Sequence, residues 1–303
     1  MGWKIAFSFI FFFAAIGLLM VYWFVPISDT KFISLDKKDN SFAGPVDKNK
    51  LQFYQNMRFS SSRISYNIED CQISKSDEME RAFQFIEDRT LLDFYPRNSN
   101  AEIKVTCDSK TKVEGELFIA GEGGPINITK IGNFNLISQG KVLLFRESKC
   151  PNPNIGLHEL LHVLGFDHVQ NPNDLMYNVS TCDQTINQET FELINYLYSI
   201  PGYPDLVIEN VSAAMKGKYL NTNFTIKNDG FVIAPGVSVE IYADEKKIKE
   251  VYINPLESGH GKIIGLTNLW VSQFNIDRLK FVVASDFSEL KKENNIIVLE
   301  VSK

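Results

Sequence analysis

Three of the four histidines in this chain of 303 residues fall within eleven positions, in the stretch HELLHVLGFDH. If residues 154–164 form a helix, His158 and His162 lie one turn apart on the same face, where both imidazoles can reach one ion. Gly165 favours the left-handed conformation that ends a helix, so the chain can reverse there and bring His168 to the same ion. The spacing therefore predicts a metal site with three imidazole ligands.

The predicted ligand set determines which metal and which chemistry to expect. Three neutral imidazoles suit zinc, and three protein ligands leave a fourth tetrahedral position for water, which is typical of a catalytic site. Zinc lowers the pKa of such a water to about 7. Glu159 directly follows the first histidine and is placed to accept the proton of this water and later pass it to a leaving amine. The sequence predicts one catalytic zinc ion, with Glu159 as the general base.

The alternative interpretation is that these histidines are ordinary helix residues, but the full pattern HExxHxxGxxH arises by chance about two times in a million such sequences. This pattern resembles the signature of the metzincin zinc endopeptidases, and NDLMY resembles their Met-turn. Met176 lies eight residues after His168, as in the matrixin-like branch. The resemblance implies that Met176 forms a hydrophobic floor beneath the metal. Val169 departs from the residues that follow the third histidine in matrixins and adamalysins. The second, structural zinc of matrixins needs further histidines, and His260 is the only histidine outside the motif, so one zinc ion is expected.

The N-terminus carries 21 consecutive residues without a charge, from Ile5 to Val25. As a helix, such a run spans about 30 Å of hydrocarbon, so residues 1–25 are predicted to be a single-pass membrane anchor. A cleaved signal peptide is the alternative, and would make the protein secreted. Its apolar core is normally about 7–15 residues long and ends at a small-residue cleavage site, whereas this run ends in WFVP.

Four cysteines without a CxxC pair indicate two disulfides in an exported chain. Of the three connectivities, we predict Cys71–Cys107 and Cys150–Cys182, because each pair encloses a compact segment; four buried free thiols are the alternative. Glycosylation motifs at Asn127, Asn178, Asn210 and Asn223 point to the same compartment. The catalytic domain is therefore expected on the extracytoplasmic side of the membrane.

Residues 26–58 are polar and are predicted to form a stalk. In residues 59–200 the patterning predicts an amphipathic helix at 76–88 with Ser76 or Asp77 as its N-cap, a closing helix at 188–200, and strands at 63–68, 101–107, 115–120, 127–137 and 141–145. This order is similar to the metzincin catalytic domain, which implies an α+β fold with a mixed five-stranded sheet and a zinc helix. In that family the edge strand binds substrate as an added strand, so part of Asn127–Ile137 would hold the peptide.

Residues 204–303 follow a break at Pro201–Pro204 and alternate with period two, as in Ser238–Tyr242. This pattern predicts an all-β, seven-stranded immunoglobulin-like sandwich. The segments PDLVIENV, FTIKNDG and KKENNIIVLEV resemble the CARDB class of cell-adhesion-related bacterial and archaeal domains. His260, in SGHGK, is interpreted as a loop residue and not as a ligand.

Together these features predict a membrane-anchored zinc endopeptidase that acts on protein or peptide substrates. The alternative from another class is a cell-surface adhesion protein whose metzincin domain is a zinc-stabilised scaffold, and an exopeptidase or amidase is a third. A cell-surface or cell-wall ligand is expected for the C-terminal domain. The net charge of −6 and the lack of a basic cluster argue against nucleic acid as a partner. Because residues 26–58 contain no cysteine that could occupy the metal, activity is expected without removal of an N-terminal segment.

Overall fold

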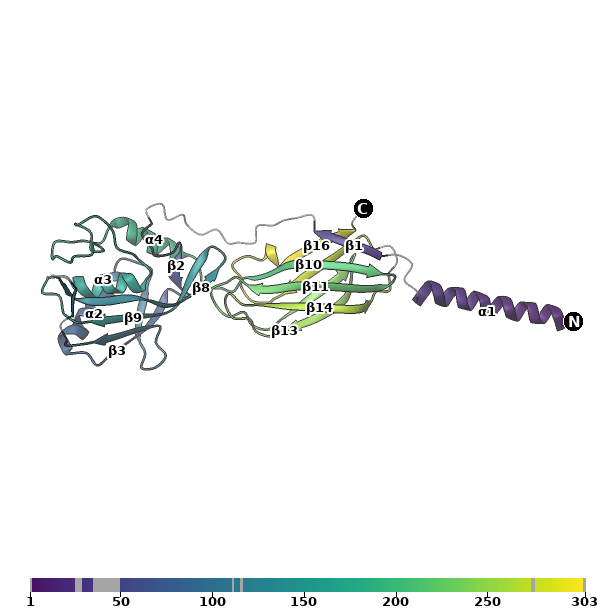
Figure 1. The fold of residues 1–303 in the computed structure, drawn as a ribbon, viewed down its shortest axis with the longest axis horizontal. Helices are drawn as coiled ribbons and strands as arrows, with labels where there is room; N and C mark the ends of the chain where they lie inside the picture. The colour runs from purple at the N-terminus through teal and green to yellow at the C-terminus, as the bar shows by residue number, and fades with distance from the viewer. Residues whose placement is uncertain are drawn as a thin grey trace. The chain divides into compact units, whose positions relative to one another are not determined.

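The computed structural model describes residues 2–24, 29–34, 50–110, 112–114, 117–273 and 276–301 of the chain. The chain forms two compact units, one made of residues 1–40 and 204–303, the other of residues 41–203. Figure 1 shows strands throughout the first unit, apart from its N-terminal helix, and a sheet with helices in the second. Because the first unit is built from both ends of the chain, the second unit is inserted within it.

The N-terminal segment forms helix α1, Gly2–Phe24. Among the described residues, we find no helix that combines the length and the apolar character needed to cross a membrane. The helix expected at the N-terminus is therefore present, but its predicted role as a membrane anchor is not confirmed. Val25, the last residue of the predicted anchor, lies outside the described residues.

The segment after α1 contributes a strand, β1 (Asp29–Ser34), to the sheet of the first unit. It pairs antiparallel with both β10 (Leu206–Lys216) and β16 (Ile296–Val301), and Phe32 is buried in the core. The prediction of a polar stalk over residues 26–58 is wrong for this segment. The physical reason is that two strand edges offer unpaired backbone groups, which a short extended segment can satisfy whatever its polarity. The prediction is also wrong at the other end of the stalk, where Met57 and Arg58 are buried and belong to a strand of the second unit, β2 (Met57–Phe59). Residues 35–49 of the predicted stalk lie outside the described residues.

The second unit is built on a six-stranded sheet in the order β2-β9-β5-β3-β4, and β8 also pairs with β9. Strands β2 and β5 pair with successive parts of β9, residues 135–137 and 140–144, whereas β8 pairs along residues 134–144. Only β8 runs antiparallel to its neighbour; the other pairings are parallel. The strands are β2 (Met57–Phe59), β3 (Arg63–Glu69), β4 (Asp93–Pro96), β5 (Ile103–Cys107), β8 (Gly121–Ile131) and β9 (Phe134–Leu144). The mixed sheet was predicted, but with five strands, because β2 and β4 are too short to produce an alternating pattern.

The strand predicted at residues 127–137 is in fact a hairpin. Gly132 and Asn133 connect β8 to β9, with Ile131 paired to Phe134 and Gly132 at a positive φ of 52°. Such two-residue turns require backbone conformations that glycine and asparagine adopt readily. The sheet edge therefore begins at Gly121, six positions before the predicted start. The strand predicted at 115–120 does not join this sheet, since β6 (Lys112–Glu114) and β7 (Leu117–Ile119) pair with each other.

The described residues of the second unit also form three helices: α2 (Ile73–Glu87), α3 (Asn154–Val163) and α4 (Gln188–Ser199). Helix α2 begins three residues before its predicted start, so the predicted caps Ser76 and Asp77 lie inside it. It packs on α3 at Gly156, where an added Cβ would lie 3.1 Å from the carbonyl oxygen of Glu78. These contacts hold α3 against both α2 and the sheet.

The C-terminal part of the first unit contains the predicted seven strands, and β1 adds an eighth between β16 and β10. The remaining strands are β11 (Tyr219–Asn228), β12 (Val237–Ala243), β13 (Lys246–Ile253), β14 (Gly261–Trp270) and β15 (Arg278–Ala284). A short 3-10 helix, η1 (Glu293–Asn295), precedes β16. The core is apolar and includes Leu206, Phe224, Phe281 and Leu299, which are fully buried. His260 is exposed in the loop before β14, as predicted.

Candidate metal centre

The end of α3 reverses the chain as the sequence predicts. Gly165 has a φ of +96°, which an L side chain rarely adopts. A Cβ at this position would also lie 2.6 Å from the Cβ of Met57. Glycine is therefore required both for the conformation of the turn and for the space around it. The backbone N–H of His168 then donates to Asp167 Oδ1 at 2.7 Å, which fixes the chain after the turn.

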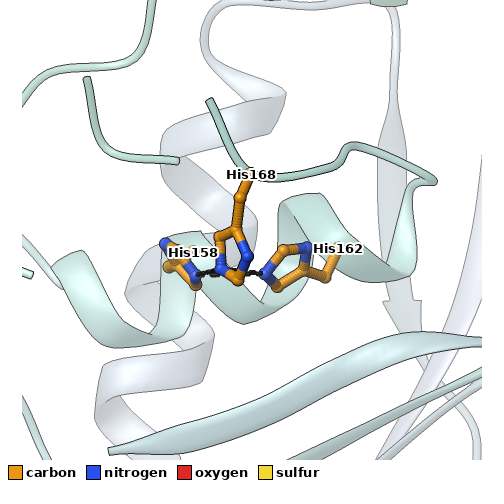
Figure 2. A group of neighbouring side chains, drawn as sticks. All are labelled: His158, His162 and His168. Atoms are coloured by element: carbon orange, nitrogen blue, oxygen red, sulfur yellow. Dashed lines mark hydrogen bonds between the residues drawn. The ribbon is translucent and has the colours of Figure 1, made fainter. Parts of the chain in front are cut away.

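The three predicted ligands meet at one point, as Figure 2 shows. The Nε2 atoms lie 3.0 Å apart between His158 and His162, 3.1 Å between His158 and His168, and 3.2 Å between His162 and His168. In the described part of the chain, no other group of three or more His, Cys, Asp or Glu side chains comes close enough to share an ion. The convergence predicted from spacing is confirmed.

The second nitrogen of two of these rings is fixed by a backbone carbonyl. Nδ1 of His158 lies 2.7 Å from the oxygen of Leu175, and Nδ1 of His162 lies 2.8 Å from the oxygen of Phe166. A carbonyl oxygen only accepts, so each Nδ1 carries the proton and each Nε2 presents a lone pair. Two lone pairs about 3 Å apart repel each other unless a cation lies between them.

The distances also suit a small ion. Zinc binds imidazole nitrogen at about 2.0–2.1 Å, so tetrahedral ligands lie about 3.3 Å apart, close to the observed separations. Burial lowers the pKa of His158, and burial with the nearby His158 lowers the pKa of His162 to about 4. Both rings are therefore neutral at pH 7, which is the form that binds a metal.

The N-terminal segment of the second unit covers the turn after α3. The N–H of Phe53 donates to the oxygen of Gly165 at 2.9 Å, and the N–H of Asp167 donates to the oxygen of Leu51 at 2.9 Å. The ring of Phe53 stacks on the imidazole of His162, with 5.7 Å between the ring centres. This segment therefore supports the second ligand through a ring contact and fixes the turn that follows the helix.

Hydrogen bonds connect the Met-turn to the segment that follows His168. Asp174 Oδ1 accepts the N–H of Met176 at 2.8 Å, and the oxygen of Met176 accepts the N–H of Val169 at 3.0 Å. Met176 is buried. Its predicted role as a floor beneath the metal stays a prediction, but its neighbour Leu175 orients His158 directly.

Glu159 is buried between α3 and the edge strand β8. A Cβ at Gly123 would lie 2.3 Å from the carbonyl oxygen of Glu159, and one at Gly121 would lie 2.7 Å from its Cγ. Burial, and secondarily the carboxylate of Glu122, raises the pKa of Glu159 to about 8. A divalent cation on the adjacent histidines would act in the opposite direction.

The N-terminus of α3 is capped by another helix. Pro153, at the N-cap position, makes no side-chain hydrogen bond, whereas Glu78 of α2 accepts the N–H of Gly156 at 3.1 Å and that of Ser148 at 3.3 Å. Burial raises the pKa of this carboxyl group. A carboxylate at a helix N-terminus satisfies donors that the helix leaves unpaired, so α2 supplies the cap that α3 lacks.

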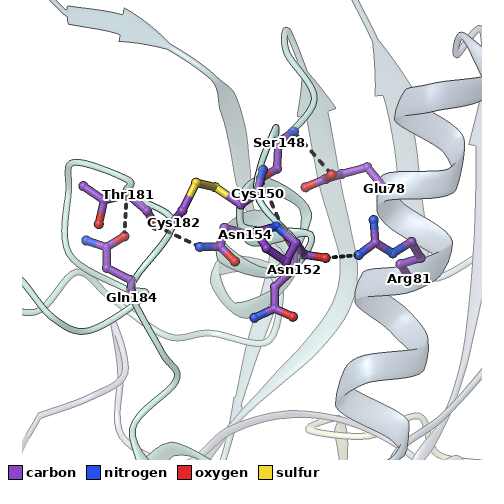
Figure 3. The surroundings of a disulfide bond; sticks show 10 residues. Glu78, Arg81, Ser148, Cys150, Asn152, Asn154, Thr181, Cys182 and Gln184 are labelled. Carbon is purple, nitrogen blue, oxygen red and sulfur yellow. Dashed lines mark hydrogen bonds between the residues drawn. A yellow bond between two sulfur atoms is a disulfide. The ribbon is translucent and has the colours of Figure 1, made fainter.

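The second unit contains two disulfides, Cys71–Cys107 and Cys150–Cys182, which confirms the predicted pairing. Figure 3 shows that Cys150–Cys182 joins the loop before α3 to the loop after the Met-turn. Beside it, Asn154 donates to the oxygen of Thr181 at 2.8 Å, and Thr181 donates its N–H to Gln184. The two segments that carry the ligands and the Met-turn are thus linked covalently and by side chains.

Several residues that build the site were not found from the sequence. These are Phe53, Glu78, the two glycines of the edge strand, and the carbonyl groups of Phe166 and Leu175. The glycine-rich stretch GEGG at residues 121–124 was the one available signal, since glycine inside a strand often marks the close approach of another backbone. The other residues act through contacts distant in sequence and leave no local pattern.

Comparison with known families matches each unit separately. Residues 52–197 match the Astacin peptidase family, and residues 203–298 match CARDB. No curated protein is similar enough to the chain to count as a match.

Solved structures similar to the chain include high choriolytic enzyme 1, a hatching enzyme zinc-protease from the medaka fish Oryzias latipes. It is 14% identical with a TM-score of 0.32, and the match covers 52% of this chain and 99% of the enzyme. The crystal structure of the CARDB domain of the PF1109 protein from Pyrococcus furiosus, in complex with di-metal ions, is 21% identical with a TM-score of 0.28. That match covers 33% of this chain and 88% of the domain.

The family matches confirm the predicted architecture of a metzincin-type domain followed by a CARDB domain. They point to the astacin branch, and the matrixin-like branch predicted from the spacing of Met176 is not supported. With the three histidines placed to bind one zinc ion, the predicted cofactor is also confirmed. A cell-surface ligand for the C-terminal domain stays a prediction.

Proposed function

We propose that the astacin-type domain of this chain is a zinc endopeptidase that hydrolyses internal peptide bonds of proteins. One observation carries the proposal: the Nε2 atoms of three imidazoles lie 3.0–3.2 Å from one another, and the residue next to the first ligand is a buried glutamate. When bound there, zinc supplies a Lewis acid that polarises a carbonyl oxygen and acidifies a coordinated water. The chain's own residues supply the proton transfer and the binding of the substrate.

Glu159 is the general base in this proposal. Its carboxylate accepts a proton from the attacking water and returns it to the amine that leaves, so it must pass between its charged and neutral forms in each cycle. The contacts of β8 with α3 hold its backbone and exclude water from one side. A rigid, partly desolvated carboxyl group is suited to moving a proton in both directions.

The edge strand β8 supplies the binding surface. In the described part of the chain, β9 is the only strand that pairs with β8, so no strand lies along its other edge. An extended peptide can add there as a further strand, with Ile126 and Ile128 exposed beside it. Because α3 lies against the start of β8, such a peptide would run past the helix that carries His158 and His162. Binding along an open edge admits the middle of a chain, which favours an endopeptidase over an exopeptidase.

The proposal is tested with Glu159→Gln, which keeps the shape of the side chain but cannot accept a proton. Hydrolysis of a fluorogenic peptide should fall by about 10²–10⁴-fold while the zinc content stays at one ion per chain. Glu192→Gln, an exposed residue of α4, is the matched control and should retain full activity. His162→Ala should lose the metal as well, because two ligands rarely retain zinc against a chelator.

A zinc-stabilised scaffold without catalysis would give a different result. The wild-type chain would then bind zinc but cleave nothing in a denatured proteome, and Glu159→Gln would change nothing. Either finding would contradict the proposal. Mapping of the cleaved bonds in the same experiment identifies the sequence preference.

We also propose that the chain is held at a membrane with the peptidase domain on the extracytoplasmic side. The uncharged run Ile5–Val25 supports anchoring, and the two disulfides support an oxidising compartment. After an alkaline carbonate wash, the full chain should stay in the membrane pellet, whereas a chain starting at Asp29 should be released. Release of both would contradict the anchor.

A further inference from the structure

Two further carboxylates, those of Glu289 and Asp229, lie near enough to the carboxylate of Asp205 in the first unit to act on its charge. Asp205 directly precedes β10, Asp229 directly follows β11, and Glu289 lies in the loop before η1. Asp229 is paired with Lys227, whose Nζ lies 2.6 Å from its Oδ1. Asp205 and Glu289 instead receive neutral donors. Asp205 accepts from Asn294 Nδ2 at 3.1 Å and from the backbone of Lys291. Glu289 accepts from Asn295 Nδ2 and from the N–H of Leu206, both at 2.9 Å, and from the hydroxyl of Ser285.

Within the described part of the chain, no cation is found to offset the charge on Asp205. The residue is 0% exposed, and the charges that act on it are those of Glu289 and Asp229, both negative. Burial is the main reason that the pKa of Asp205 is raised to about 6 from its usual 3.8. Above pH 6 this carboxylate is therefore ionised at a cost to the fold, and the cost disappears below pH 3.8, where it is protonated both folded and unfolded.

Three oxygens at this place are buried and have no hydrogen-bond partner among the described residues. They are Oδ2 of Asp205, Oδ1 of Asn294 and Oδ1 of Asn295. The two asparagines are 2% and 4% exposed and sit side by side in η1. A buried acceptor without a partner is costly, and one bound cation would compensate these oxygens together with the negative charges of Asp205 and Glu289.

We propose that these side chains form a binding site for one calcium ion, with oxygens of Asp205, Asn294 and Asn295 as ligands and Glu289 as the second negative charge. Carboxylate and amide oxygens are the ligands that calcium prefers, in flexible arrangements of six to eight. Magnesium demands near-ideal octahedral geometry and keeps several waters, which suits a site of buried side chains poorly. A half-turn of either asparagine amide exchanges its oxygen and nitrogen, and so turns the oxygen toward the carboxylates.

The ion would tie together segments distant in sequence. Asp205 starts β10, and the two asparagines lead directly into β16, so calcium would fix the start of both strands. The inference concerns the C-terminal domain alone and does not depend on the peptidase activity. A failure to bind calcium and a failure to cleave peptides are therefore separate outcomes.

The experiment uses the full chain, loaded with zinc and dialysed free of calcium, and titrates it with calcium chloride in a calorimeter. We expect the wild type to bind one calcium ion. The affinity of Asp205→Asn for calcium should be about tenfold lower or weaker still. Glu250→Gln is the matched control, because it removes the same charge from an exposed residue of β13 that pairs with Lys247. It should bind calcium as the wild type does.

Hydrogen exchange supplies a second readout at the site itself. Calcium should slow exchange in peptides that cover residues 204–210 and 288–298 of the wild type and of Glu250→Gln, but not of Asp205→Asn. Without calcium, Asp205→Asn should exchange no faster than the wild type, because it loses a buried, uncompensated charge. Should this variant fail to fold, Asn295→Ala, which removes a neutral ligand, is expected to weaken calcium binding instead.

Three results would overturn the inference. They are the absence of calcium binding at millimolar concentration, equal binding by Asp205→Asn and the wild type, and equal binding of magnesium at the same concentration. The first would mean that ordered water satisfies the three oxygens, the second that calcium binds elsewhere, and the third that the site does not select calcium.

Discussion

Gly123 shows how closely the site depends on single residues. The backbone of β8 passes so near to α3 that any side chain at this position would overlap the carbonyl oxygen of Glu159. Its neighbour Gly124 has no atom within 4 Å of an added Cβ. The two glycines are adjacent in one strand but differ in what they permit, so their substitution separates a packing effect from a general effect of losing glycine.

We predict that Gly123→Ala lowers both the thermal stability of the second unit and the peptidase activity, because β8 must move away from α3. Gly124→Ala should change neither measurably. Since overpacking costs about 1–3 kcal/mol, the melting temperature of Gly123→Ala should fall by several degrees. Calorimetry and a fluorogenic peptide assay measure the two quantities. Equal effects of the two substitutions would show that the close approach does not matter.

The orientation of the ligands is also set at the scale of single residues. His158 and His162 are held by backbone carbonyls of Leu175 and Phe166, which no substitution of side chains removes directly. Such partners of a metal ligand fix its tautomer and its direction. The site is therefore prearranged for a metal by the path of the main chain after α3.

At the scale of elements, the buried side chain of Arg58 connects the two ends of the second unit. It extends from β2 and donates to the oxygens of Leu197 and Ile200 at the C-terminal end of α4. Its guanidinium also lies over the ring of Tyr198, 5.0 Å from the ring centre. The negative end of the helix dipole favours a cation there, which helps to offset the burial of the charge.

We predict that Arg58→Met lowers the free energy of unfolding of the second unit by about 3 kcal/mol, because methionine leaves buried carbonyls without donors. Arg63→Met is the matched control. Arg63 is exposed and pairs with Asp93 on the surface, so its loss should cost less than about 0.5 kcal/mol. Urea unfolding followed by circular dichroism measures both. A similar small cost for both variants would mean that α4 is held by its apolar face alone.

At the scale of the whole molecule, the second unit is inserted in sequence between strands β1 and β10 of the first unit. The CARDB family match begins at residue 203, so it does not include β1. The strand nevertheless pairs with both β10 and β16, and it joins strands on either side into one sheet. The ends of the chain are thereby tied together in one domain.

We predict that a chain starting at Lys50, which lacks β1, has a C-terminal domain that melts at a lower temperature than the same domain in a chain starting at Asp29. Removing β1 opens the edges of β10 and β16 and takes Phe32 out of the core. Open strand edges also promote association, so sedimentation velocity should detect larger species. Equal melting and equal sedimentation would show that β1 contributes nothing to the domain.

The second unit provides the control for this comparison. Both chains should hydrolyse one fluorogenic peptide at the same rate, because the segment removed contains no cysteine that could occupy the metal. A longer chain that is silent until it is trimmed would instead identify residues 29–49 as an inhibitory segment.

The metal site could be predicted because its determinants are local. The helical repeat places His158 and His162 on one face, and Gly165 allows the turn that returns His168, all within eleven residues. Alternation with period two likewise predicted the seven C-terminal strands, since strands such as β12 alternate between buried and more exposed residues. Where a feature depends on neighbours in sequence, the pattern of residue types was sufficient.

The remaining features depend on contacts between distant segments. The pairing of β1 with β10 and β16, the cap that Glu78 provides for α3, and the approach of Gly123 to Glu159 each join segments that are far apart in the chain. Backbone hydrogen bonds form between any two strands whose edges meet, whatever their side chains, so no residue type in residues 29–34 indicates a partner. Only the tertiary structure decides which edges and which buried groups come together.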